Sequence, residues 1–260
     1  MYVPGALCII VGFYLMHRLR DTPQSLGLPP IEKFRDDYPT SKHEVEQEVS
    51  AKEILFKYVL NNRYVWLLAI AYFFIYVIRT AINDWSVLFL VEQKGYSVVA
   101  AAVSVLWFEA GGFCGSLVAG WASDKIYGGR RGPINVIFSM AVTLALAALW
   151  FSPGLMIVDF ALMFIVGFLI YGPQMLIGMA AVELSHKKAS GTATGFVGWV
   201  AYFGAAATGY PLGKIIQELG WYGFFAILAV CGVTAVLFLL PLWGAKTHPK
   251  YASEKLLPEA

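Results

Sequence analysis

The sequence has few of the residues that enzymes and metal sites use. Cys8, Cys114 and Cys231 are its three cysteines, and each stands alone within an apolar stretch, without the spacing of a metal site or a disulfide framework. Its four histidines lie in loops or near the ends of apolar runs, outside any HExxH or nucleophile-elbow pattern. The sequence therefore predicts no metal, no cofactor and no enzyme activity.

Charge is also scarce, and it is not concentrated in one place. Charged residues make up 14% of the 260 positions, and the formal net charge is only +2. The lysines and arginines are spread over loops rather than gathered on one face, so we expect no nucleic-acid partner. The stretch "GYPLGK" at 209–214 does not make a phosphate-binding loop, because it is one residue short and is followed by Ile215 rather than serine or threonine.

Long apolar runs fill most of the sequence instead. Hydrophobic residues make up 58% of the chain and the mean hydropathy is +0.64, which is too apolar for a water-soluble domain of ordinary composition. A helix that crosses a bilayer needs roughly 20 consecutive apolar residues. We therefore predict an all-α, multi-pass protein of the lipid bilayer, with a first crossing that is cut short. The seven candidate runs cover residues 2–16, 64–91, 98–122, 134–151, 155–184, 195–216 and 221–243.

The basic residues alternate between the two sides of this predicted bundle. Sixteen of the 19 lysines and arginines fall in the loops at 18–63, 123–133 and 185–194 or beyond residue 243, whereas the other side holds only Lys94 and Lys214. Cytoplasmic loops of membrane proteins carry the excess of lysine and arginine. We therefore expect the first loop and the C-terminus to be cytoplasmic.

The only long polar stretch separates the first run from the other six. Four prolines between residues 23 and 39 prevent a continuous helix in its first half, and Ser41 is placed to cap a short helix over 43–57. Such a stretch is typical of a linker between two membrane bundles. The expected segments are the end of one bundle at 1–17, a central loop at 18–63, a six-helix bundle at 64–245 and a tail at 246–260.

Glycine and proline indicate how the spans pack. Glycines three to five residues apart occur throughout the third run, from Gly111 to Gly120, and again between 191 and 213 in the sixth. Small residues at such spacing let helices approach closely, so we interpret nearly all of them as packing residues. In the fifth run, "YGP" at 171–173 removes a backbone hydrogen bond and predicts a kink or a break.

Arg79 lies in the middle of the second run. At 1.5 Å per residue it is about 24 Å along the helix from Arg63, and an arginine at a helix centre costs roughly 2.5–3.5 kcal/mol on insertion scales. Such a residue is expected to face a cavity or a partner charge rather than lipid. Helical periodicity places Tyr72, Tyr76 and Asn83 on the same face.

Two roles for Arg79 remain open on these grounds. Glu109 lies midway along the next, antiparallel run, so the two charges are at similar depth and can form a structural ion pair. A guanidinium also offers two parallel donors that match the oxygens of a phosphate group, and a pair that opens for such a ligand would serve transport. The midplane position favours substrate contact, which would extend to Tyr76 and Asn83 on the same face.

The loop after the third run has a more specific pattern. It reads "GWASDKIYGGRRG" at 120–132, and a plain turn with inside-positive charge would account for its composition. The order Gly-x-x-x-Asp-Lys-x-x-Gly-Gly-Arg-Arg, however, resembles the loop motif of the major facilitator superfamily. The resemblance implies that Asp124 caps or pairs with helix ends and releases them when the bundle rocks. The predicted ion-pair and gating residues are therefore Glu109, from its position in the third run, and Asp124, Lys125, Arg130 and Arg131 of this loop.

Four longer stretches carry a closer resemblance. They are "RDTPQSLGLPPIE" at 20–32, "RTAINDW" at 79–85, "FLIYGPQMLIGMAAVELSHKKASGTATGF" at 168–196 and "GYPLGK" at 209–214. Together they resemble the organophosphate:phosphate antiporters, especially the hexose-phosphate branch and its membrane sensor. The resemblance implies the C-terminal half of a twelve-helix protein of a bacterial inner membrane. The chain would then hold the last helix of the N-terminal bundle, the central loop and the second six-helix bundle, and the first bundle would be a partner.

The resemblance also assigns residues, position by position. Organophosphate antiporters have one phosphate-binding arginine in the first helix of each half, and Arg79 matches the second of these. Tyr76, Tyr171 and Tyr202 match tyrosines that line the family's glycerol-phosphate site, and Glu109 matches an acid of the second bundle. These residues are therefore the implied substrate site.

Two functions follow from the resemblance. The first is exchange of a sugar phosphate, hexose 6-phosphate, for inorganic phosphate by alternating access. Where the hexose-phosphate carrier has an Asp/Lys pair in its eleventh helix, this sequence has Thr194 and Val197, and its surroundings are closer to those of the sensor. The alternative is therefore a membrane sensor that reads external hexose phosphate for a histidine kinase.

Overall fold

The computed structural model describes residues 2–20, 23–29, 34, 50–185 and 189–245. The chain divides into two compact units, Met1–Gln47 with Ala252–Ala260, and Glu48–Tyr251. The described part of the first unit holds the apolar helix α1 (Tyr2–Arg18) and the short helix η1 (Pro23–Leu26). The predicted cap at Ser41 and residues 43–49 of the predicted helix over 43–57 lie outside the described residues. The described remainder is helical from α3 (Ala51–Glu53) onward, and α3 begins at a cap formed by Ser50.

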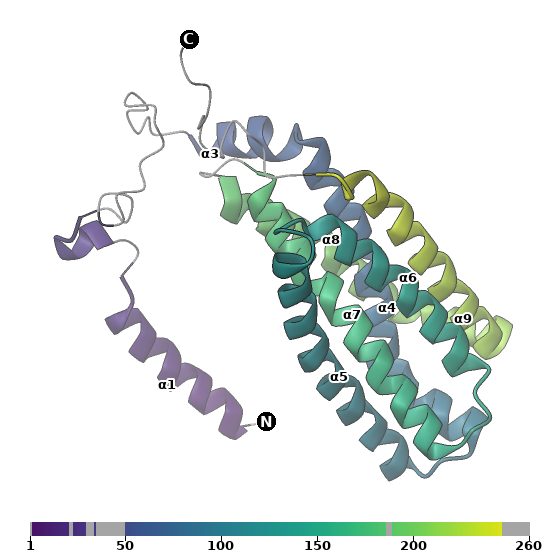
Figure 1. The fold of residues 1–260 in the computed structure, drawn as a ribbon. Helices are drawn as coiled ribbons and strands as arrows, with labels where there is room; N and C mark the ends of the chain where they lie inside the picture. The colour runs from purple at the N-terminus through teal and green to yellow at the C-terminus, as the bar shows by residue number, and fades with distance from the viewer. Residues whose placement is uncertain (1, 21–22, 30–33, 35–49, 186–188, 246–260) are drawn as a thin grey trace. The chain divides into compact units, whose positions relative to one another are not determined.

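The second unit is a bundle of long helices, and its described residues form no strand (Figure 1). The π-helix η2 (Ile54–Leu60) precedes the first long helix, α4 (Arg63–Lys94). The others are α5 (Val98–Lys125), α6 (Arg131–Trp150), α7 (Met156–Glu183), α8 (Ser190–Ala207), α9 (Tyr210–Leu239) and the final turn η4 (Leu240–Leu242).

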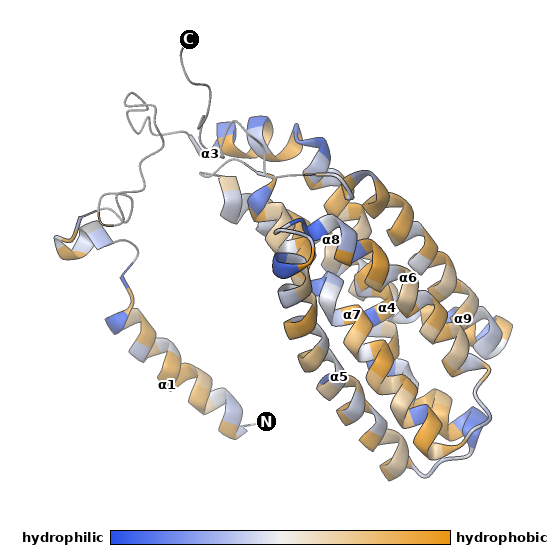
Figure 2. Ribbon diagram, viewed as in Figure 1, coloured by the Kyte–Doolittle hydropathy of each residue, from blue (hydrophilic) through white to orange (hydrophobic). Residues whose placement is uncertain are grey.

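The helices of this unit have the length and apolar character of membrane spans. Five helical stretches in the described part of the chain meet both criteria, with α8 and α9 counted as one stretch from Ser190 to Leu242. Figure 2 shows hydrophobic residues along the helices and more hydrophilic ones near several helix ends. The length and composition of these helices confirm the prediction of an all-α membrane protein.

The last two predicted spans are divided differently from expectation. The run 195–216 was expected to be one helix, but α8 ends at Ala207 and α9 begins at Tyr210, because Pro211 has no backbone N–H to continue the preceding helix. α9 then passes through Gly220, whose φ of 65° and ψ of −164° are not helical. Glycine adopts this conformation without a steric penalty, so α9 consists of two helical pieces, and the second begins at the predicted residue, Trp221. α7, in contrast, continues through Pro173 without a break.

Glycines set the close contact between α5 and α7. A Cβ added to Gly111 would overlap the backbone carbonyl of Phe164, and one added to Gly115 would overlap that of Phe168. In the other direction, a Cβ on Gly167 of α7 would overlap the backbone of α5. The packing interpretation is therefore confirmed for these α5 glycines.

The glycines of α8 differ from one another. Gly204 lies against the backbone of Phe73 in α4, where a Cβ would not fit. Gly191, Gly195 and Gly198 have no neighbouring atom within 4 Å of a built Cβ. The packing interpretation is not borne out for these three within the described bundle, because no atom of the bundle lies close to their side of α8.

The loops of the bundle gather at two ends, which we call the Arg131 end and the Lys94 end. At the Arg131 end, Asn62 Nδ2 donates to the carbonyl oxygen of Leu184 at 2.8 Å. At the Lys94 end, Lys94 Nζ donates to the carbonyl oxygen of Ser152 at 2.6 Å, and Tyr96 Oη donates to the buried Asp159 at 2.5 Å. Successive loops thus alternate between the two ends, as the distribution of basic residues predicts.

Candidate functional site

Arg79 lies about midway along α4 and faces α7. Its side chain is half-buried, and Nη2 donates a hydrogen bond to the hydroxyl of Tyr171 at 3.1 Å. The guanidinium carbon is 5.4 Å from the centre of the Tyr171 ring, which is a cation–π distance. Nε of Arg79 is buried and has no hydrogen-bond partner among the described residues. The guanidinium is therefore held from one side only.

Tyr171 connects Arg79 to the acid predicted as its partner. The Tyr171 hydroxyl donates to Oε2 of Glu109 at 2.6 Å, and no ion pair joins Arg79 and Glu109 directly in the described structure. The Tyr171 ring reaches α5 because Gly112 leaves room for it: a Cβ there would lie 2.5 Å from the ring. The two charges are thus at the same depth, as predicted, but a phenol separates them.

Three further tyrosines extend this cluster along α4 and onto α8. The rings of Tyr72 and Tyr76 are 4.7 Å apart in an edge-to-face arrangement, and those of Tyr76 and Tyr202 are 5.6 Å apart. Tyr72 Oη donates to the backbone carbonyl of Gln174 at 2.8 Å. The structure therefore brings Tyr76, Tyr171 and Tyr202 to one region around Arg79, although they come from three helices.

Gln174 was not identified from the sequence. Its side-chain Oε1 is buried and unpartnered among the described residues, and it lies three residues after Tyr171 on α7. A polar residue directly after the "YGP" stretch of an otherwise apolar run was the available signal. Gln174 and Arg79 each have one buried polar atom without a partner among the described residues, which is unfavourable unless another group bonds to it.

Asn83 lies one turn of α4 beyond Arg79, toward the Lys94 end. Its amide donates to Oδ1 of the exposed neighbour Asp84 at 2.9 Å. Among the described residues, Asn83 has no hydrogen bond to the tyrosine cluster, because its amide bonds to the next residue along α4.

The arrangement suits an anionic ligand that also has hydroxyl groups. The guanidinium has an unused donor, and the Tyr171 phenol lies between opposite charges, so both can bond to oxygen atoms of a ligand. The aromatic rings on two sides can cover a sugar ring. Glu109 is exposed, and Tyr202 is 67% exposed, so the cluster is open on one side of this chain. Among the described residues, no group of three or more histidine, cysteine, aspartate or glutamate side chains is arranged to hold a metal ion.

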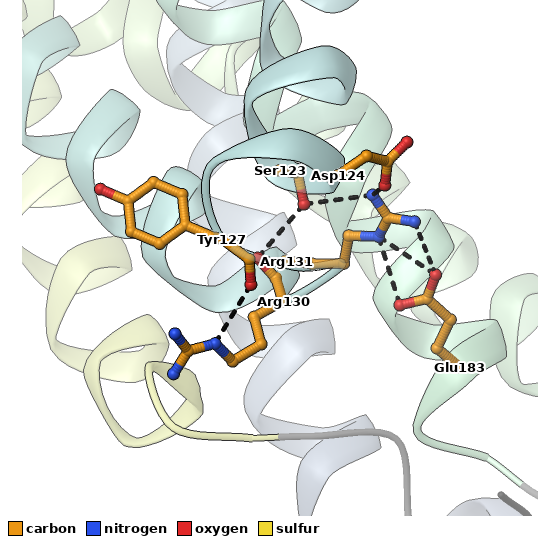
Figure 3. Close-up of polar contacts among 6 residues, drawn as sticks. All are labelled: Ser123, Asp124, Tyr127, Arg130, Arg131 and Glu183. Atoms are coloured by element: carbon orange, nitrogen blue, oxygen red, sulfur yellow. Dashed lines mark hydrogen bonds and ion pairs between the residues drawn. The ribbon is translucent and has the colours of Figure 1, made fainter.

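A second polar cluster occupies the loop between α5 and α6 (Figure 3). Arg131 is its centre: Nη1 donates to Asp124 Oδ1 at 2.6 Å and to Ser123 Oγ at 3.1 Å. Nη2 and Nε donate to Glu183 at the end of α7, the shortest contact being 2.9 Å. The Arg131 side chain is only 10% exposed. Arg131 therefore ties the ends of α5 and α7 to the start of α6.

The other predicted gating residues contribute differently. Arg130 Nε donates to the backbone carbonyl of Tyr127 at 3.2 Å, and Lys125 is exposed, with no hydrogen bond or ion pair in the described structure. Glu183 was missed from the sequence. An acid in the last turn of an apolar run, on the side that carries the basic loop, was the signal for it.

Comparison with known proteins identifies the family. A family model for the major facilitator superfamily matches residues 1–209. The chain is 54% identical over 257 residues to the probable hexose phosphate transport protein of Chlamydia muridarum. It is 46% identical over 249 residues to the membrane sensor protein UhpC of Escherichia coli K12, and 34% identical over 268 residues to the hexose-6-phosphate:phosphate antiporter of that organism.

These alignments cover most of this chain but only part of each relative. The shares of this chain are 94%, 95% and 98%, whereas the shares of the relatives are 56%, 57% and 57%. The chain thus spans little more than half the length of the relatives it matches. Its apolar helices, the loop motif at 120–132 and the match over residues 1–209 agree, and the chain belongs to the major facilitator superfamily.

Proposed function

We propose that this chain is the C-terminal half of a secondary transporter that exchanges a sugar phosphate, of the hexose 6-phosphate class, for inorganic phosphate by alternating access. Relatives named as a hexose phosphate transport protein and as a hexose-6-phosphate:phosphate antiporter support this proposal. The observation that carries it is Arg79, a mid-span guanidinium held by one phenol and with a buried, unpartnered Nε.

Arg79 binds the phosphate group in this proposal. Two parallel N–H donors match two phosphate oxygens, and the unpartnered Nε supplies one donor that the unliganded protein leaves unused. A position near the bilayer midplane strengthens the interaction, because water screens it less than at the surface. The phosphate then provides the negative charge that Arg79 reaches only through Tyr171 in the unliganded protein.

Glu109 competes with the phosphate for Tyr171. A hydroxyl has one proton to donate, and in the unliganded structure that proton is directed at Glu109. Phosphate binding requires Tyr171 to release Glu109 if the phenol is to donate to the ligand. Tyr76 and Tyr202 contact the sugar, and Asn83 donates to one of its hydroxyls after leaving Asp84.

The Arg79 cluster is open at Glu109 and Tyr202, and in this proposal a second bundle covers that side. Glu109 and Tyr202 are exposed on this chain, and the described residues contain no second arginine beside Arg79. We propose that an N-terminal six-helix bundle covers this side and adds a second phosphate-binding arginine. The substrate site of a transporter then lies between two bundles near the midplane.

The Arg131 cluster acts as the gate in this proposal. Its bonds to Asp124 and Glu183 hold three helix ends together at the Arg131 end. Rocking of one bundle against the other breaks and remakes contacts of this loop, to which Lys125 and Arg130 add positive charge. We propose that the Arg131 end, the central loop and the C-terminus lie in the cytoplasm and that the protein lies in the bacterial inner membrane, as the excess of lysine and arginine on that side suggests.

A membrane sensor is the second candidate. The 46% identity to the sensor UhpC over 95% of this chain favours it, and the same Arg79 cluster would then bind hexose phosphate from outside and signal to a histidine kinase. Binding without exchange distinguishes a sensor from a transporter.

Exchange of labelled phosphate for glucose 6-phosphate, measured with the full-length protein in proteoliposomes, tests the proposal. Wild-type protein should exchange, and Glu109→Gln should bind phosphate several-fold more tightly because a neutral amide holds the Tyr171 proton less strongly than a carboxylate. Tight binding of glucose 6-phosphate without exchange would support the sensor. Absence of both binding and exchange in well-folded protein would refute both functions.

A further inference from the structure

A pocket lies at the Arg131 end of the bundle, away from the Arg79 cluster. Its volume is about 570 Å³, within the roughly 300–1,000 Å³ typical of small-molecule sites. Leu68 of α4 lines it, and Leu68 is eleven residues from Arg79, or about 16 Å along the helix. The pocket is lined mainly by the loop from Ile126 to Arg130, the first turns of α6 and the end of α7.

The positive charge of this pocket comes from Arg130. The neighbouring Arg131 also lines the pocket, but its donors are bound to Asp124, Ser123 and Glu183. Arg130 uses only Nε, and its terminal nitrogens have no hydrogen bond or ion pair within the described residues. Figure 3 shows its guanidinium turned away from the Arg131–Glu183 pair. Two donor groups of Arg130 are therefore available to a ligand.

The start of α6 adds backbone donors to the same wall. α6 begins at Arg131 with no side chain bonded to its first N–H groups, and both Arg131 and Gly132 line the pocket. Free N–H groups and the helix dipole favour an anion at such an end. The loop before α6 turns through Gly128 and Gly129, which have positive φ and nothing within 4 Å of a built Cβ. A ligand can therefore reach the start of α6 without meeting the side of this loop.

Asn135 provides an independent sign of a ligand. It lines the pocket one turn into α6, is only 1% exposed, and has a buried side-chain oxygen without a hydrogen-bond partner. A buried amide oxygen without a donor is unfavourable, and the donors of Arg131, which lines the same pocket, are bound to Asp124, Ser123 and Glu183. A ligand that satisfies Asn135 has to donate an O–H or N–H group.

We propose that this pocket binds a phosphate ester that also has a hydroxyl or ammonium group. Its phosphate oxygens accept from Arg130 and from the first N–H groups of α6, and its donor group bonds to Asn135. Two sources share this chemistry: a soluble sugar phosphate, and the headgroup of a phospholipid with a hydroxyl or amine. The site is separate from the proposed substrate site and does not depend on exchange activity.

Binding to purified full-length protein with Arg79→Gln tests this proposal, since that change removes the proposed substrate contact and leaves the pocket intact. Glucose 6-phosphate is the soluble probe, measured by calorimetry. Short-chain phosphatidylethanolamine and phosphatidylglycerol are the lipid probes, measured by native mass spectrometry, and phosphatidylcholine is the matched lipid without an O–H or N–H donor.

At least one probe class should bind, and Arg130→Gln should weaken its binding about tenfold or more. Asn135→Leu should reduce the preference for phosphatidylethanolamine over phosphatidylcholine, or for glucose 6-phosphate over inorganic phosphate, whichever class binds. Lys125→Gln, which removes one positive charge from the same loop outside the pocket lining, should change affinity less than twofold.

The soluble probe and the lipid probes together show whether the ligand is a sugar phosphate or a phospholipid headgroup. Thermal unfolding checks that each variant is folded. No binding of either class to folded protein, or binding that Arg130→Gln and Asn135→Leu leave unchanged, would overturn the proposal and leave a pocket that holds only water. Loss of exchange with retained pocket binding would refute the proposed transport function without affecting this site.

Discussion

Replacing Arg79 with lysine separates a structural role from a phosphate-binding role. Within the described chain the guanidinium makes one hydrogen bond, to Tyr171 at 3.1 Å, and a lysine ammonium can donate to the same phenol. A single hydrogen bond contributes about 0.5–1.5 kcal/mol, so Arg79→Lys should lower the free energy of unfolding by less than about 1 kcal/mol. The folded state therefore depends little on which cation is present.

The effect on phosphate binding should be much larger. An ammonium keeps the charge but loses the planar pair of donors, which removes one charge-assisted hydrogen bond worth about 1.5–3 kcal/mol. Since 1.4 kcal/mol is a factor of ten, the affinity should fall about 10- to 150-fold. Equilibrium binding of labelled phosphate and of glucose 6-phosphate to the purified full-length protein measures this change, and thermal unfolding measures stability in the same samples.

Two further variants make the result decisive. Arg63→Lys is the matched control, because Arg63 also bonds to a tyrosine hydroxyl on α4 but is exposed, and it should leave affinity unchanged. Replacing Arg79 and Glu109 together with leucine removes both charges that Tyr171 bridges, so no unpaired charge remains; the double variant should fold but not bind. Affinity within twofold of wild type in Arg79→Lys, or full function in the double variant, would refute phosphate binding by Arg79.

Three other predictions concern packing, the loop cluster and topology. Gly115→Ala should lower the free energy of unfolding by about 1–3 kcal/mol, because its Cβ would overlap the α7 backbone. Gly178→Ala is the control and should be tolerated, because nothing lies within 4 Å of a Cβ built there. Equal thermal unfolding of the two variants would contradict the described contact between α5 and α7. Arg131→Gln should lower the free energy of unfolding by about 2–4 kcal/mol, because it leaves Glu183 and Asp124 without their partner. Unfolding in urea measures this change. A loss below about 0.5 kcal/mol, which is the size of ordinary surface effects, would mean that the ion pairs are not formed. A cysteine at Pro153 should react with an impermeant thiol reagent in intact cells while one at Tyr127 is protected, and the reverse pattern would overturn the proposed orientation.

Much of the architecture was predictable from the sequence because a bilayer imposes simple rules. Length and apolar composition identify helices that must satisfy their own backbone hydrogen bonds in lipid, and the boundaries of α4 to α7 follow from these runs and their polar ends. The break between α8 and α9 at 208–209 was not predicted, because it depends on local backbone geometry, whereas the break at Gly220 falls between the two predicted runs.

The candidate site was predictable in part. An arginine at the centre of an apolar run is costly enough to require an explanation, so Arg79 was identified without a structure, and helical periodicity placed Tyr76 beside it. Periodicity within one helix says nothing about which residues of another helix approach. The position of Glu109 along its run predicted its depth correctly, but not its separation from Arg79 by Tyr171.

Sequence alone determined that the chain is an all-α membrane protein of the major facilitator superfamily, with an arginine midway along one apolar run and a basic loop, because composition, periodicity and motif order are properties of single segments. Only the tertiary structure decided that a phenol from α7 bridges Arg79 and Glu109, that Glu183 completes the Arg131 cluster, and that Asn135 is left without a donor beside an open pocket. These are contacts between helices, and they depend on where glycines such as Gly112 and Gly115 let two backbones approach.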